Sequence, residues 1–122
     1  MKIIGIVGSR RRNAQEDFSA CWNAFIKLYE EGDKIVSGGC PTGGDRFAEI
    51  IAEKFGLTIE NGGLIIHEAL WKEYGKRAGF MRNTDIAKDA DVIIAVVASD
   101  RTGGTEDTLH KAMKFHKKIV IV

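Results

Sequence analysis

Short apolar runs alternate along the chain with longer segments in which apolar residues recur every three or four positions. The first run, Lys2–Gly8, is rich in isoleucine and valine and ends at a turn signal, which is typical of a strand buried on both faces. The longer segments have the spacing of amphipathic helices. We expect strands over Lys2–Gly8, Lys34–Ser37, Asp91–Ala98 and Lys118–Val122, and helices over Ala14–Glu31, Asp45–Phe55, Phe80–Ala90 and Thr105–His116.

The middle of the chain departs from this regular order. Leu57–Ile59 and Leu64–His67 are both apolar, but Asn61–Gly63 separates them, so they form either one interrupted strand or a small hairpin. The next segment, Glu68–Gly79, mixes aromatic residues, glycines and charges. We expect a loop or a short helical turn there, which covers part of the surface as a rim.

The order of strands and helices predicts the fold class. Strands that alternate with helices indicate right-handed crossovers and a parallel sheet that is covered on both faces. We therefore expect an α/β fold: a single three-layer Rossmann-like domain over residues 1–122, with a mainly parallel sheet in strand order 3-2-1-4-5. A length of 122 residues and a hydrophobic share of 44% are enough for one such core.

Charge and cysteine content restrict the classes of partner. A formal net charge of +1 produces no strong field, so neither nucleic acid nor an anionic membrane is indicated. The chain enters a strand at once, without a charged leader or a long apolar stretch, and we expect no membrane segment. Two cysteines indicate a reducing, cytoplasmic location. We expect no metal, because the three histidines lack metal-binding spacing with the cysteines. We expect no cofactor either, because no Gly-x-Gly-x-x-Gly follows the first strand and no Gly-x-x-x-x-Gly-Lys-Ser/Thr occurs.

Glycine-bearing turns follow three of the apolar runs. A glycine turn that ends a strand and opens a helix exposes backbone N–H groups to an anion, so these turns predict a crevice that holds phosphate. A single glycine pair equally suits a turn that only needs positive φ angles. Asp45 and Thr105 also suit the caps of the helices that follow. The candidate binding residues are Gly8, Ser9, Arg10, Gly38, Gly39, Thr42, Gly43, Gly44, Asp45, Gly103, Gly104 and Thr105.

Charged side chains near these turns are a second group of candidates. We expect at least one arginine of Arg10–Arg12 to pair with a phosphate, whereas a solvated charge run is the commoner explanation for the other two. Arg82 and Asn83, near the start of a helix, are further phosphate candidates. Glu106 and Asp107 suit the first turn of a helix through its dipole. Alternatively, one of these two acids faces the crevice and activates a water or polarises a sugar hydroxyl.

The expected rim carries Trp71 and Tyr74, which either stack on a base or simply pack against the protein. A rim rich in aromatic residues also suggests a homo-oligomer in which a second copy packs against it. Cys40, in the second glycine turn, is either an exposed thiol or just a small residue.

Several of these features together resemble the SLOG superfamily of Rossmann-like domains, which joins the lonely-guy phosphoribohydrolases to DNA-processing proteins and to small stand-alone nucleotide-binding proteins. The resemblance spans nearly the whole chain and is greatest to the small stand-alone branch. The residues that carry it are Gly8-Ser9-Arg10, Ser37-Gly38-Gly39, Gly43-Gly44-Asp45-Arg46, Trp71, Tyr74-Gly75, Ala78-Gly79, Arg82-Asn83 and Gly103-Gly104-Thr105.

The resemblance implies a small nucleotide-like ligand, bound through glycine turns at the carboxyl edge of the sheet by a sensor, carrier or effector module. Lonely-guy enzymes cleave the bond between a base and ribose 5′-monophosphate with an arginine and a glutamate. The matching positions here are Arg82, followed by Asn83 in place of lysine, and Glu106 or Asp107 after a shorter Gly-Gly-Thr turn. An N-glycosidic hydrolase with these catalytic residues is therefore the alternative function. Single-stranded nucleic-acid binding is a third, which the near-neutral charge disfavours.

Overall fold

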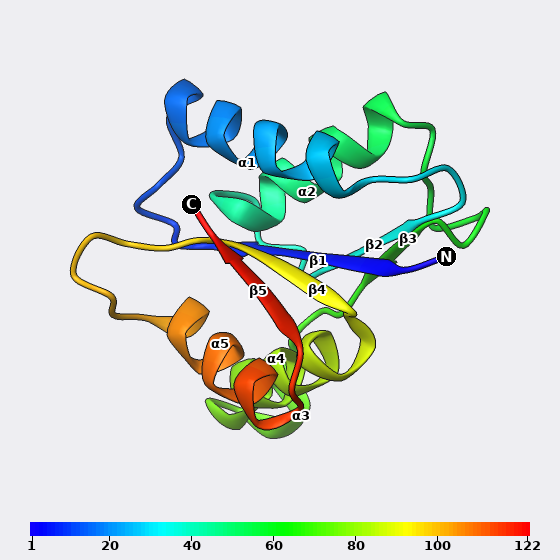
Figure 1. Ribbon diagram of the computed structural model, residues 1–122. Helices are drawn as coiled ribbons and strands as arrows, with labels where there is room; N and C mark the ends of the chain where they lie inside the picture. The colour runs from blue at the N-terminus through cyan, green and yellow to red at the C-terminus, as the bar shows by residue number, and fades with distance from the viewer.

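A computed structural model describes residues 1–122, the whole chain. Five parallel strands form one sheet in the order β3-β2-β1-β4-β5, with helices on both faces (Figure 1). The predicted α/β class, the Rossmann-like layering and the strand order 3-2-1-4-5 are confirmed. The strands are β1 Ile3–Gly8, β2 Lys34–Ser37, β3 Leu64–Ile66, β4 Val92–Val96 and β5 Lys118–Ile121; the helices are α1 Gln15–Leu28, α2 Gly44–Lys54, α3 Trp71–Tyr74, α4 Arg77–Asp89 and α5 Gly104–Lys114.

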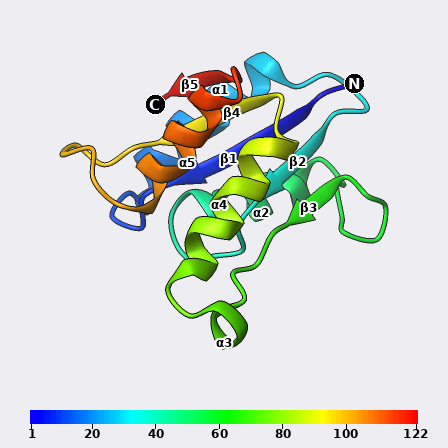
Figure 2. The same ribbon diagram turned by 90° about the horizontal axis from the view of Figure 1, so that it is seen from below.

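The sheet separates two apolar cores, because successive side chains of a strand point to opposite faces. On one face, Ile4 and Ile6 of β1 pack with buried residues of α1 and α2, including Phe25. On the other face, Val7 packs with residues of α4 and α5, including Ile86. Figures 1 and 2 show this division, with α1 and α2 on one side and α3, α4 and α5 on the other.

Helix α2 begins directly over the end of β1, because two glycines let the two backbones touch. A Cβ atom at Gly44 would lie 2.3 Å from the amide nitrogen of Gly8, and one at Gly43 would lie 2.5 Å from the carbonyl oxygen of Ser9. Gly43 also has a φ of +74°, a conformation that side chains disfavour. This contact holds the turn after β1 at the carboxyl edge of the sheet.

The expected interrupted strand or hairpin before residue 68 does not form. Only Leu64–Ile66 is a strand, and it runs parallel to β2. The Asn61 side chain accepts hydrogen bonds from the amides of Thr58 (3.0 Å) and Gly63 (2.8 Å) and thereby closes a turn where a second strand was expected.

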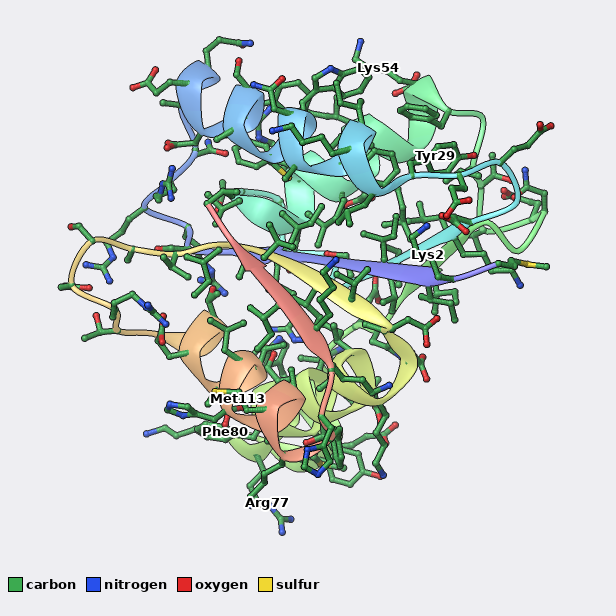
Figure 3. All side chains as sticks on the ribbon, in the orientation of Figure 1. Lys2, Tyr29, Lys54, Arg77, Phe80 and Met113 are labelled. Atoms are coloured by element: carbon green, nitrogen blue, oxygen red, sulfur yellow. The ribbon has the colours of Figure 1, made fainter.

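Helix α4 begins at Arg77, three residues earlier than expected. Gly79 lies inside its first turn, where a Cβ atom would be 3.1 Å from the Trp71 ring. Arg82 and Asn83 therefore lie in the second turn of the helix and not at its start. In α5, Leu109 and Ala112 are buried, whereas Met113 is 62% exposed at the surface of the molecule (Figure 3). None of the five helices combines the length and apolar character needed to cross a membrane.

Candidate functional site

A cavity of about 300 Å³ opens at the carboxyl edge of the sheet, beside the ends of β1 and β4. Parallel strands that reverse their order between β1 and β4 leave such a crevice at this point. Four segments that are distant in sequence line it. They contribute Val7, Gly8, Ser9, Arg10 and Arg11; Cys40 and Asp45; Arg82, Asn83 and Ile86; and Thr102, Gly103, Gly104, Thr105 and Thr108. We call this the first cavity.

The N-terminus of α5 is open on the side of the first cavity. Gly103 precedes the helix with a φ of +107°, and no side chain caps the first N–H groups. Gly103 and Gly104 are both exposed, and a Cβ atom at either would meet nothing within 4 Å, so the start of the helix is uncovered. Thr105 is only 9% exposed, yet its hydroxyl makes no hydrogen bond within the protein. Unpaired donors at a helix N-terminus attract anions.

Arg82 enters the cavity from α4 in a fixed position. Its Nη1 donates to the carbonyl oxygen of Gly38 at 3.0 Å, and its Nε donates to Oδ1 of Asn83 at 3.1 Å. Asn83, 7% exposed, in turn donates to the carbonyl oxygen of Gly104 at 3.3 Å. The pair therefore ties α4 to the turn after β2 and to the start of α5, and it leaves part of the guanidinium for a ligand.

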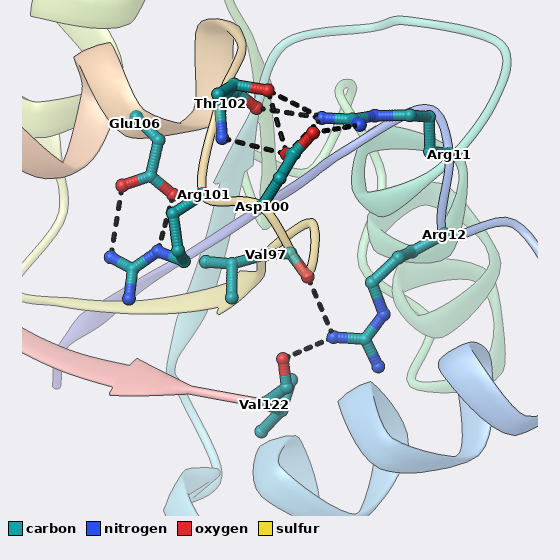
Figure 4. A network of polar contacts seen from close by, with 8 residues as sticks. All are labelled: Arg11, Arg12, Val97, Asp100, Arg101, Thr102, Glu106 and Val122. Atoms are coloured by element: carbon teal, nitrogen blue, oxygen red, sulfur yellow. Dashed lines mark hydrogen bonds and ion pairs between the residues drawn. The ribbon is translucent and has the colours of Figure 1, made fainter.

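The three consecutive arginines after β1 have three different environments. Arg10 lines the cavity, is exposed and has no hydrogen-bond or ion-pair partner. Arg11 binds both oxygens of Asp100 at 2.8 Å and the Thr102 hydroxyl at 2.9 Å (Figure 4). The hydrogen bond from Arg11, and then that from Thr102, lowers the pKa of Asp100. This clamp joins the turns after β1 and β4.

Arg12 is structural and not part of a solvated charge run. Its Nε donates to Asp17 at 2.9 Å, and its Nη1 donates to the carbonyl oxygens of Val97 and Val122 (Figure 4). The side chain is 27% exposed. The expectation of a solvated charge is therefore wrong for Arg12, whereas Arg11 is 56% exposed and remains solvated while it pairs with Asp100.

The two acids of the first α5 turn do not line the cavity. Glu106 accepts from Arg101 at 2.8 and 3.0 Å (Figure 4), and its side chain is 14% exposed. Asp107 accepts from Lys111 at 2.8 Å and from Asn83 at 3.0 Å. Each carboxylate is thus paired with a cation that does not line the cavity, Arg101 for Glu106 and Lys111 for Asp107.

Asp45 is the carboxylate that does line the first cavity. It does not cap α2 as expected, because it lies inside the helix and accepts from groups before it: the Ser37 hydroxyl and the Cys40 amide, both at 3.0 Å. The cap position is Gly43, which has no side chain to offer. Asp45 therefore holds the turn after β2 together.

The glycine pairs of the second turn are divided between two tasks. Gly38 and Gly39 line a neighbouring cavity of about 270 Å³, described below as the second cavity. Gly43 and Gly44 line neither cavity, and the Gly43 amide donates to Oδ1 of Asn13 at 2.9 Å. Thr42 also lines neither. The second pair thus serves the packing of α2 on β1.

Several lining residues were not singled out from the sequence. Ile86 follows Arg82 by four positions and Thr108 follows Thr105 by three, which places each on the same face of its helix one turn later. This helical spacing could have identified Ile86 and Thr108 from the sequence. No sequence pattern identifies Thr102, because its position at the cavity depends on the contact with Arg11.

Comparison of the chain with protein-family models, curated proteins and solved structures finds no match. The resemblance to the SLOG superfamily therefore stays a prediction. No group of three or more histidine, cysteine, aspartate or glutamate side chains gathers where it would hold a metal ion.

Proposed function

We propose that this protein binds the phosphate group of a nucleotide or nucleotide-derived ligand in the first cavity, as a sensor, carrier or effector module. One observation carries the proposal. The open N-terminus of α5, the unpaired Thr105 hydroxyl, and the side chains of Arg10 and Arg82 all meet at one cavity.

The charges around the cavity favour an anion. Arg11 is neutralised by Asp100, and both oxygens of Asp45 already accept hydrogen bonds within the protein. Arg10 and Arg82 form no ion pair, so two positive charges face the single negative charge of Asp45 and the balance of charge at the cavity is positive. Phosphate oxygens accept both from guanidinium groups and from backbone N–H groups, and such charge-assisted bonds are stronger than neutral ones.

Binding without turnover fits this geometry better than hydrolysis. Stabilising an oxocarbenium-like sugar needs a carboxylate near the scissile bond. Glu106 and Asp107 are both held by cations away from the cavity. A hydrolase reaction would have to release one of them or recruit Asp45 from its two internal hydrogen bonds.

A single backbone donor tests the proposal. Gly104 is the first residue of α5, where proline is tolerated because the N–H there has no partner within the helix. Gly103 before it has a ψ of −174°, an extended value that a following proline permits. Gly104→Pro therefore removes one N–H group from the cavity and keeps the helix. Gly104→Ala is the matched control, since it keeps the N–H and its methyl group enters open space.

The measurement is a calorimetric titration with ribose 5-phosphate and with nucleoside 5′-monophosphates. We expect Gly104→Ala to bind like the wild type and Gly104→Pro to lose roughly tenfold or more in affinity, the value of one charge-assisted hydrogen bond. Arg10→Ala should lose affinity too, whereas Arg77→Ala, an exposed arginine pointing away from the sheet (Figure 3), should not. No binding by the wild type, or equal binding by the two Gly104 variants, overturns the proposal. Chromatography of the same mixtures for free base distinguishes a binder from a hydrolase.

A further inference from the structure

The second cavity lies next to the first and shares three of its lining residues: Arg10, Cys40 and Arg82. Its remaining walls come from the glycine turn after β2 and from the segment that leads into α3, which the view from below shows projecting past the start of α4 (Figure 2). Each cavity alone is at or below the small end of the range for small-molecule sites, whereas the two together fall well inside it. This favours one ligand with two parts over two separate ligands.

Trp71 provides an aromatic surface in the wall of the second cavity. Its ring lies against Gly79 of α4, where a Cβ atom would be only 3.1 Å from Cη2. The glycine thus lets the indole rest on the helix, yet 53% of the residue stays exposed. A large aromatic residue that is fixed on one side and uncovered on the other is suited to stack on a flat ring.

Glu68 provides the polar group of the second cavity. It is exposed and has no ion-pair or hydrogen-bond partner in the protein. Its Cγ and Oε1 lie 3.5 and 3.8 Å from the point that a Cβ atom of Gly39 would occupy, so the carboxylate lies over the glycine turn. A carboxylate accepts hydrogen bonds and repels phosphate. The ligand's phosphate therefore belongs in the first cavity and a hydrogen-bond donor in the second.

We infer that the second cavity holds the base of a guanine nucleotide, with Trp71 stacked on the ring and Glu68 accepting from its edge. The inference rests on the proposed phosphate site in the first cavity. Guanine presents two adjacent donors, N1–H and the 2-amino group, which match the two oxygens of one carboxylate. Adenine presents one amino donor beside the acceptor N1, which would face a carboxylate oxygen. The pairing therefore selects guanine over adenine.

The test compares GMP, AMP and ribose 5-phosphate, the last of which has the phosphate and no base. We expect GMP to bind at least tenfold more tightly than AMP, and Glu68→Gln to lose roughly tenfold in affinity for GMP with no change for ribose 5-phosphate. Glu73→Gln is the matched control, because this acid lies in the same short helix as Trp71 and lines neither cavity. GMP should quench tryptophan fluorescence in the wild type and not in Trp71→Leu, which retains only Trp22.

The outcomes separate this inference from the proposed function. If ribose 5-phosphate binds but GMP and AMP bind equally well, or if Glu68→Gln leaves GMP affinity unchanged, the base site is wrong and the phosphate site stands. If no phosphate compound binds, the proposed function itself fails. An affinity for AMP above that for GMP also refutes the role given to Glu68.

Discussion

The contact between Gly44 and Gly8 offers a sharp test of the geometry that places the first cavity. Alanine at Gly44 puts a Cβ atom 2.3 Å from the Gly8 nitrogen, 2.4 Å from the Val7 carbonyl carbon and 2.7 Å from the Gly8 Cα. All three are backbone atoms, and real Cβ atoms almost never come within 3.0 Å of a neighbour. No side chain is there to rotate away, so α2 and β1 must separate.

The size of the effect follows from this overlap. Relieving it moves the start of α2 by about 1 Å. Overpacking of this kind costs about 1–3 kcal/mol, and the shift also strains the hydrogen bond from the Gly43 amide to Asn13, worth about 1 kcal/mol. The higher helix propensity of alanine relative to glycine offsets less than about 1 kcal/mol of this loss. We therefore expect Gly44→Ala to lower the free energy of unfolding by about 3 kcal/mol, a large fraction for a domain of this size.

Urea unfolding followed by circular dichroism measures this change. Gly104→Ala is the control, because it is the same substitution at the first residue of another helix and meets nothing within 4 Å. Its free energy of unfolding should stay within about 1 kcal/mol of the wild type, on the stabilising side. If Gly44→Ala has the same midpoint and slope as the control, α2 does not rest on β1 as described, and the place of the first cavity is also wrong.

Two further predictions concern titrating groups. Burial raises the pKa of Asp33, but the hydrogen bond from the Lys2 side chain and those from backbone amides outweigh it, so the pKa is lowered overall. A carboxylate with a lowered pKa stabilises the fold at pH values above its unfolded pKa of about 3.9. Asp33→Asn should therefore lower the urea midpoint at pH 7, and the difference in midpoint from the wild type should narrow as the pH falls below about 4. A difference in midpoint that stays constant with pH contradicts this prediction. Burial raises the pKa of Cys21 to about 12, whereas Cys40 lines both cavities. Iodoacetamide at pH 8 should therefore label only Cys40 in the native protein, and the labelling should be slower when nucleotide is bound. Labelling of Cys21 without urea, counted by mass spectrometry, refutes this reading.

The glycine turns show how far prediction of the candidate site could go. The pairs Gly43-Gly44 and Gly103-Gly104 look alike in the sequence, since each precedes a helix and is followed by a polar residue. One pair touches the backbone of β1, and the other is open to the cavity. The difference lies in what stands opposite each pair, and no local pattern records this.

The arginines and acids support the same conclusion. Arg10 and Arg11 are adjacent and identical, yet only Arg11 meets Asp100, a residue that the sheet brings close from 89 positions away. Glu106 was predicted as a catalytic candidate from its spacing after the glycine turn, and the sequence could not show that Arg101 occupies its carboxylate. Which side chains become partners depends on how distant segments fold together, and the spacing of residues along the sequence does not show it.

The sequence by itself determined the alternation of strands and helices and, through it, the strand order and the edge where the turns gather. Those properties follow from the periods of apolar residues and from the handedness of crossovers, which act over short stretches of chain. Only the tertiary structure decided which glycines stay uncovered, which arginines stay unpaired and which carboxylates reach a cavity. All three outcomes depend on contacts between segments that are distant in the chain. The packing of α2 on β1 and of α4 beside α5 decides which of these groups remain free.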